Sequence, residues 1–207
     1  MIVKVCGMQN AENIRQVELA GADWMGFIDY DRSPRHVAGI PQYLPAAVRK
    51  VGVFVQAPLS RILERRADWQ LDLVQLHGNE SPDFCRKLRL SGIKIIKAFA
   101  LRTAEDLPAT EAYAPYCDYF LFDTPCSGFG GSGKTFDWEL LSRYRGPRPF
   151  LLSGGLNPAS LERLAAFRHP LWAGIDLNSG FELAPALKDA AALSAFISAF
   201  KQIPYNL

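Results

Sequence analysis

The chain has no long hydrophobic run and no sequence typical of a secretory signal. Its longest apolar-rich stretch, residues 190–200, contains two serines and stops at Lys201, well short of the roughly 20 residues that cross a bilayer. Near the N-terminus, Lys4 interrupts the position where a signal peptide needs its apolar region. We therefore expect a soluble cytoplasmic protein with no transmembrane helix.

Strong charge of either sign is also missing. Lys and Arg total 23 against 21 Asp and Glu, a formal net charge of +2, and no basic block or acidic tail occurs. Proteins that bind nucleic acid or anionic membranes usually concentrate basic residues on one face. This sequence gives no support to either partner, and we expect a small-molecule ligand instead.

Cysteine is scarce and widely spaced. The four residues Cys6, Cys85, Cys117 and Cys126 form no C-x-x-C pair, which argues against a structural zinc site and against a disulfide scaffold. Reduced thiols are expected. Cys85 and Cys117 fall in apolar segments and are interpreted as small buried hydrophobes.

Short apolar runs alternate with segments of helical period along all 207 residues, the pattern of β-α units around a parallel sheet. The expected strands are residues 2–6, 24–28, 50–55, 71–76, 94–99, 118–123, 149–152 and 172–176. The expected helices are residues 11–20, 59–68, 82–90, 138–144, 159–167 and 189–200. Proline interrupts the connections 41–48 and 104–113, so we expect these to be partly irregular.

Eight such units predict a closed (β/α)8 TIM barrel of minimal length, in a single domain covering residues 1–207. An open doubly wound sheet is the alternative, although it usually has fewer strands. No linker, low-complexity tract or shift in composition divides the chain.

Polar residues stand at the ends of several expected strands, where barrel enzymes place their chemistry. Lys4 and Cys6 share one face of the first strand, and an ammonium beside a thiol favours the thiolate, a base or nucleophile. Asp123 closes an apolar run, where desolvation favours the protonated form of a general acid. Structural alternatives are an inert buried thiol and a turn-capping carboxyl. His77 is a candidate proton carrier or substrate donor, or a structural histidine.

Glycines follow the last two strands. Ser153-Gly154-Gly155-Leu-Asn and Asn178-Ser179-Gly180 occupy the two loops whose backbone N–H groups often bind phosphate in such barrels. Ordinary loop glycines are the alternative.

Residues 128–135 match G-x-x-x-x-G-K-[ST], the phosphate loop of nucleotide-binding proteins. Only two expected strands remain after this run, whereas a nucleotide-binding core builds most of its sheet after the loop. A glycine-rich lid over the barrel mouth explains the same residues, and we leave the NTPase as a minor alternative.

Taken together, the motifs resemble phosphoribosylanthranilate isomerase. The similarity is carried in order by Lys4-Val-Cys-Gly-Met8, Ser33-Pro-Arg35, Gly52-Val-Phe-Val55, Gln75-Leu-His-Gly78, Asp123, Gly130-Gly-Ser-Gly-Lys-Thr-Phe-Asp-Trp138, Ser153-Gly-Gly-Leu156 and Asp176-Leu-Asn-Ser-Gly-Phe-Glu182.

The resemblance implies an Amadori rearrangement of a phosphoribosyl-anthranilate in tryptophan biosynthesis, with no metal or organic cofactor. It implies that Cys6 is the general base, that Asp123 is the general acid and that Arg35 binds the anthranilate carboxylate. The phosphate would lie against Gly154, Gly155, Ser179 and Gly180. Further candidate substrate-binding residues are Lys4, His77, Asp176 and, in the glycine-rich segment, Gly131 and Gly133.

The chain departs from the family pattern at Asp29, Asp31 and His36. Two carboxylates near an anionic substrate are unexpected, and we expect them to pair with Arg32 or to face away. They also leave open a non-catalytic phosphosugar-binding barrel. His36 and His169 are expected to face solvent, and the chain is expected to be a monomer or a homodimer.

Overall fold

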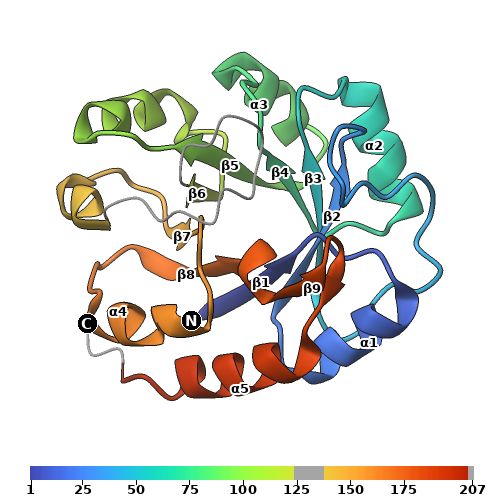
Figure 1. The fold of residues 1–207 in the computed structure, drawn as a ribbon. Helices are drawn as coiled ribbons and strands as arrows, with labels where there is room; N and C mark the ends of the chain where they lie inside the picture. Colours follow the sequence, from blue (N-terminus) through green and yellow to red (C-terminus); the bar gives the residue numbers. More distant parts are fainter. Residues whose placement is uncertain (124–137, 205–207) are drawn as a thin grey trace.

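The structure, a computed structural model, describes residues 1–123 and 138–204. Eight parallel strands form a closed barrel in the order of the sequence, with β1 pairing with both β2 and β8 (Figure 1). The strands are β1 Ile2–Cys6, β2 Trp24–Asp29, β3 Arg49–Phe54, β4 Leu73–Leu76, β5 Lys94–Ala100, β6 Tyr119–Asp123, β7 Phe150–Leu152 and β8 Trp172–Leu177. The predicted TIM barrel is confirmed.

Helices surround the barrel on its outside (Figure 1). The α-helices are α1 Ala11–Leu19, α2 Leu59–Asp68, α3 Pro82–Arg89, α4 Leu161–Ala166 and α5 Ala190–Lys201, and the 3-10 helices are η1 Ala104–Tyr113, η2 Trp138–Arg143, η3 Pro158–Ser160 and η4 Ser179–Phe181. Side chains cap several of the starts, because the first backbone N–H groups of a helix have no partner within it. Asn10, Ser81 and Asp189 each accept a hydrogen bond from the backbone N–H three residues later.

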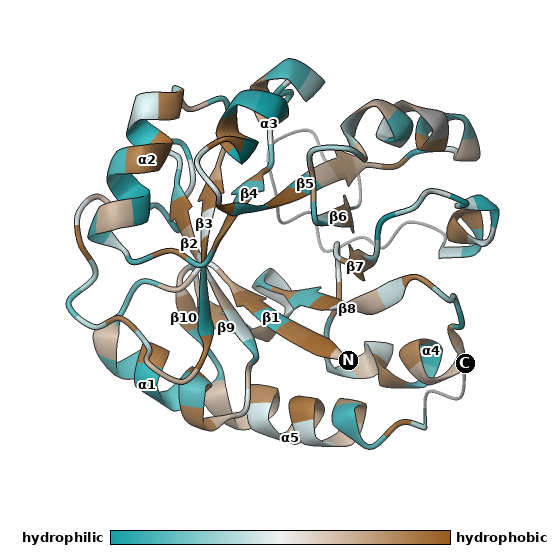
Figure 2. Cartoon of the chain, turned by 180° about the vertical axis from the view of Figure 1, so that it is seen from behind, coloured by the Kyte–Doolittle hydropathy of each residue, from teal (hydrophilic) through white to brown (hydrophobic). Residues whose placement is uncertain are grey.

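Two apolar layers hold these elements together. Inside the barrel, one layer includes Trp24, Val51, Leu73 and Leu151, while a larger layer fills the space between the strands and the helices. In Figure 2 the strands are largely brown and the helices carry teal residues. A parallel strand that is buried on both faces needs apolar residues at consecutive positions, which explains the short unbroken runs in the sequence.

The structure corrects the predicted helices in two places. Residues 138–144, expected to be an α-helix, form η2, and the helix expected at 159–167 begins as η3 before α4. Of the two connections predicted to be partly irregular, residues 41–48 contain no helix, and residues 104–113 form the 3-10 helix η1. A hairpin of β9, Glu182–Ala184, and β10, Leu187–Lys188, was not predicted, because strands of two or three residues leave no periodic signal. Among the described residues, no helix has the length and apolar character needed to cross a membrane.

Candidate active site at the carboxyl ends of the strands

A cavity opens at the carboxyl ends of the barrel strands. Polar side chains from distant parts of the chain line it together with the loops after β2, β7 and β8. The polar and glycine residues of this lining include Cys6, Tyr30, Ser33, Arg35, Gln75, His77, Asp123, Ser153, Gly154, Gly155, Asp176, Asn178 and Ser179. The structure thus brings most of the predicted site residues together around one pocket.

Cys6 ends β1 and Asp123 ends β6, and both line this cavity. Four strands separate β1 from β6 in one direction around the barrel and two in the other, so the thiol and the carboxyl come from different sides of the mouth. A ligand lying between them could therefore exchange protons with the thiol on one side and with the carboxyl group on the other.

Beneath the thiol lies a buried ion pair. The ammonium of Lys4 contacts Asp176 Oδ1 at 2.8 Å, and both side chains are buried. Lys4 lies two residues before Cys6 on the same face of β1, as the strand period predicts, and the two groups interact electrostatically. Burial alone lowers the pKa of Lys4, but Asp176 and Cys6 outweigh it and hold that pKa above its usual value. Lys4 therefore remains an ammonium and lies below the residues that line the cavity.

The thiol itself differs from the prediction. We expected the ammonium to favour the thiolate, yet burial raises the pKa of Cys6 by more than Lys4 lowers it, and the carboxylate of Asp176 adds to the rise. A charged thiolate loses its hydration inside the barrel, and the ammonium of Lys4 is shared with the carboxylate of Asp176. In the unliganded protein the sulfur is accordingly protonated at neutral pH.

This raised pKa predicts slow alkylation of Cys6 near pH 7. The rate with iodoacetamide should climb through and above the range in which an ordinary thiol, of pKa about 8.5, titrates. Mass spectrometry of the Cys6 peptide between about pH 7 and pH 10 measures this. Lys4→Met should move the rise to still higher pH, since it removes the neighbouring positive charge. Fast labelling at pH 7 that does not change with pH would contradict the prediction.

Arg35 reaches the cavity from the loop after β2. Its guanidinium donates to both carboxylate oxygens of Glu182, from Nε at 2.8 Å and from Nη2 at 2.6 Å. These hydrogen bonds raise the pKa of Arg35 despite its burial. Lys188 Nζ donates to the same carboxylate at 2.6 Å and to Asn178 Oδ1 at 2.7 Å. The cluster holds two cations and one carboxylate, so it carries a net positive charge beside the cavity.

Glu182 and Lys188 were not among the predicted site residues. Glu182 ends the motif of residues 176–182, and this position was the only feature of the sequence that could have identified it. No sequence feature identified Lys188, which is a buried lysine on a two-residue strand. Burial lowers the pKa of Lys188 even though the carboxylate of Glu182 raises it.

Gly7 makes room for the Arg35 side chain. Its φ is +78°, and a Cβ atom placed there would lie 2.6 Å from Arg35 Cδ. Gly7→Ala should therefore reduce the free energy of unfolding by about 1–2 kcal/mol through backbone strain and should raise KM by displacing the guanidinium. Chemical denaturation and steady-state kinetics check both effects. A variant with unchanged stability and unchanged KM would show that the site tolerates the added methyl group.

His77 follows β4 and lies close to both Gln75 and Asp123. Gln75 Nε2 lies 2.8 Å from His77 Nδ1, and His77 Nε2 lies 3.4 Å from Asp123 Oδ2. The imidazole therefore lies between the Gln75 amide and the Asp123 carboxyl group.

The loops after β7 and β8 pack against each other. Gly154 and Gly155 both have a positive φ, 86° and 68°, and together with Ser179 they line the cavity. Gly180, in the loop after β8, packs against the backbone of the loop after β7, because a Cβ atom there would come 2.0 Å from the backbone oxygen of Leu156. Glycine is required where two backbones approach this closely. Gly131, Gly133 and the phosphate-loop match at 128–135 lie outside the described residues, as does Cys126.

The two unexpected carboxylates do not enter the cavity. Asp29 faces helix α2, where its partners are Arg61, Arg65 and His36 rather than Arg32, and Asp31 is exposed and contacts His36. The expectation that both other histidines face solvent was wrong. His36 is largely covered by these contacts, and the buried ring of His169 bonds to backbone atoms of Tyr144 and Leu171. Cys85 and Cys117 are buried as predicted.

Within residues 1–123 and 138–204, no group of three or more His, Cys, Asp or Glu side chains is arranged to hold a metal ion. The groups available to a ligand in the described lining include the thiol, the carboxyls, the imidazole, the guanidinium, several hydroxyl and amide groups, and loop backbone. This set suits acid–base chemistry on a small anionic molecule.

Comparisons with known proteins agree with this arrangement. Residues 3–199 match the family described as N-(5'phosphoribosyl)anthranilate (PRA) isomerase. A protein of that name from Phocaeicola vulgatus is 55% identical over 202 residues, which cover 98% of each chain. The crystal structure of phosphoribosyl anthranilate isomerase from Thermotoga maritima is 36% identical with a TM-score of 0.84, over 97% of this chain and 99% of that one.

A further solved structure contains the same named enzyme in complex with reduced 1-(o-carboxyphenylamino)-1-deoxyribulose 5-phosphate. It is 33% identical, with a TM-score of 0.81 over 97% of this chain and 99% of that chain.

Proposed function

The chain belongs to the N-(5'-phosphoribosyl)anthranilate isomerase family, and from this premise we propose how its cavity performs the reaction. It is an enzyme of tryptophan biosynthesis that converts N-(5-phosphoribosyl)anthranilate into 1-(2-carboxyphenylamino)-1-deoxyribulose 5-phosphate. The conversion is an isomerisation, in which protons move and no external oxidant or reductant takes part. The protein must therefore supply one proton donor, one proton acceptor and a rigid hold on the substrate.

Asp123 is the proposed general acid. Its carboxyl protonates the furanose ring oxygen, the bond from that oxygen to C1′ breaks, and the anthranilate nitrogen forms a Schiff base with C1′. Cys6 then loses its thiol proton to solvent, and the resulting thiolate, beside the ammonium of Lys4, removes the proton from C2′. The electron pair of that C–H bond forms the C1′=C2′ double bond of an enolamine, and the electron pair of the C=N bond returns to nitrogen. The enolamine then takes a proton at C1′ and loses the proton of its C2′ hydroxyl group, which gives the ketone. Both side chains line the same cavity, and this observation carries the proposal.

The other residues bind and orient. Arg35, held by Glu182, is placed to bind the anthranilate carboxylate through its remaining N–H groups, since a planar guanidinium matches a carboxylate. Backbone N–H groups around Gly154, Gly155, Ser179 and Gly180 suit the phosphate. His77 orients Asp123, and Lys4, paired with Asp176, stabilises the thiolate when it forms. Gly131 and Gly133 stay proposed contacts outside the described residues.

A direct turnover assay tests the function. Purified protein, freed of metal and nucleotide, should convert the substrate with the accompanying change in anthranilate-type fluorescence. Binding of the reduced product without turnover would point instead to the non-catalytic phosphosugar-binding barrel. The two carboxylates that suggested this alternative no longer support it, because Asp29 faces α2 and Asp31 is exposed, so neither enters the cavity. The NTPase alternative requires an open sheet, which the closed barrel excludes.

The expected cytoplasmic location and the expected monomer or homodimer remain predictions. Size-exclusion chromatography with light scattering measures the oligomeric state.

A further inference from the structure

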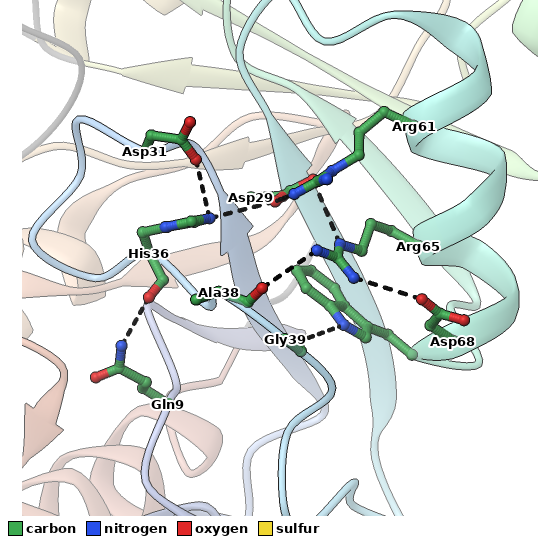
Figure 3. A network of polar contacts seen from close by, with 10 residues as sticks. Gln9, Asp29, Asp31, His36, Ala38, Gly39, Arg61, Arg65 and Asp68 are labelled. Atoms are coloured by element: carbon green, nitrogen blue, oxygen red, sulfur yellow. Dashed lines mark hydrogen bonds and ion pairs between the residues drawn. The ribbon is translucent and has the colours of Figure 1, made fainter.

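Asp29 is a buried acid on the outer face of the barrel, next to the loop that carries Arg35. It is the last residue of β2, and its side chain is 3% exposed. Arg61 donates to both of its oxygens, from Nε at 2.7 Å and from Nη2 at 2.9 Å. Figure 3 shows Asp29 between His36 on one side and the two arginines of α2 on the other. The remaining contacts are Arg65 Nε at 3.6 Å and His36 Nε2 at 3.4 Å.

Side chains of the loop after β2 face either the cavity or helix α2. Tyr30, Ser33 and Arg35 line the cavity, while Asp29 and His36 lie on the side of α2. After Arg35 the chain returns to β2: His36 forms a parallel bridge with Ile28, and Val37 N donates to Ile28 O at 2.8 Å. The imidazole of His36 thus contacts the carboxylate at the other end of its own loop, and Arg35 is the residue directly before it.

Helix α2 also holds the outgoing end of the loop. Arg65 Nη2 donates to Ala38 O at 3.4 Å, and the indole N–H of Trp69, the residue after α2, donates to Gly39 O at 3.0 Å (Figure 3). From the side of β1, Gln9 donates to the carbonyl of His36 at 2.7 Å. Both ends of the Arg35 loop are therefore fixed from outside the barrel by directional polar contacts.

Barrel closure does not need this cluster. Main-chain pairing already joins β2 to β1 and β3 along the strand, and apolar residues in place of the whole cluster would avoid the desolvation of its charges. Burial alone would raise the pKa of Asp29, but Arg61, Arg65 and His36 outweigh it and hold that pKa below its usual value. A buried ionised carboxylate with several fixed donors gives orientation that an apolar contact lacks.

We propose that Asp29 and Arg61 are positioning residues that fix the loop after β2 and thereby aim Arg35 at the substrate carboxylate. The two residues act from outside the cavity and touch no reacting atom. This inference rests on the proposed function, in which Arg35 binds the anthranilate carboxylate. Arg35 is then held from two directions, by Glu182 at its guanidinium and by the Asp29 cluster at its backbone.

Arg61→Gln is the sharpest test, because Arg61 is 37% exposed and its loss leaves Asp29 in contact with Arg65 and His36. We expect KM for the substrate to rise roughly tenfold, the effect of weakening one charged contact, while kcat changes little. Inhibition by inorganic phosphate should be unchanged, because the loops after β7 and β8 do not touch this cluster. Arg61→Lys, which keeps the charge, should recover part of the loss.

Asp29→Asn should raise KM in the same way, and the double variant Asp29→Asn/Arg61→Gln should be less impaired than the two single effects combined. Arg86→Gln is the control, since Arg86 is another arginine that donates from Nε and Nη2 to a carboxylate, here the exposed Asp83 of its own helix α3. Its KM should stay at the wild-type value.

The outcomes separate the two proposals. Normal wild-type turnover together with unchanged KM in Arg61→Gln and Asp29→Asn would overturn the positioning role and leave the function intact. Equal losses of affinity for substrate and inorganic phosphate would reduce the cluster to a structural role. Wild-type protein that binds phosphate yet never turns over the substrate would overturn the function, and the positioning role with it.

Discussion

Replacing Cys6 with alanine is expected to lower kcat by roughly 10²–10⁴-fold, the contribution typical of a positioned general base. The methyl group that remains cannot accept the C2′ proton. The affinity for the reduced product should change little, because the sulfur removes a proton and binds no charged group of the ligand. Steady-state kinetics and calorimetric titration with the reduced product measure the two effects separately.

Cys85→Ala is the matched control. Cys85 is another buried thiol, but it lies on α3 outside the cavity, so its loss should alter stability and leave kcat unchanged. Near-normal turnover by Cys6→Ala would remove the thiol from the mechanism.

Asp123→Asn is expected to lower kcat to a similar extent, again roughly 10²–10⁴-fold. The amide has nearly the same shape as the carboxyl and can still contact His77, but it is a far weaker acid and cannot protonate the ring oxygen. Substrate should still bind, and ring opening should become the slow step. Kinetics with purified variant protein check this.

Asp83→Asn, which changes an exposed carboxylate on α3, provides the comparison and should behave as the wild type. If Asp123→Asn retained wild-type kcat, another group would have to be the acid.

The barrel could be predicted because local sequence and global fold agree. Each strand is buried on both faces, so runs such as Ile95–Ile96 and Phe120–Phe122 mark strands without any knowledge of their partners. The alternation with helical segments then leaves few topologies. The same agreement located the cavity, because polar residues at the carboxyl ends of buried strands have little structural reason to be there.

Long-range electrostatics could not be predicted. That Lys4 pairs with Asp176 depends on β1 and β8 meeting when the barrel closes, and these residues are 172 positions apart. The position of Lys188 beside Glu182 depends on a short hairpin. The raised pKa of Cys6 follows from burial and shared charge, neither of which a strand period reveals.

The direction of the Asp29 side chain and its partner could not be predicted either. Its position in the sequence suggested a carboxylate near the substrate, yet one residue along a strand decides whether a side chain faces the barrel interior or a helix. Ile28 points into the barrel and Asp29 points toward α2. Arg61, its partner, lies 32 positions away, and no local pattern links the two.

The separate tasks of Cys6 and Asp123 are tested most directly by single turnovers of substrate carrying hydrogen or deuterium at C2′. Breaking that bond is the task assigned to the thiol. In Cys6→Ser the hydroxyl group ionises far less readily than a thiol, so proton removal should limit the rate and deuterium should slow it markedly. In Asp123→Asn, ring opening should limit the rate and deuterium should have almost no effect. The reverse pattern, with the deuterium effect in Asp123→Asn and none in Cys6→Ser, would contradict the account.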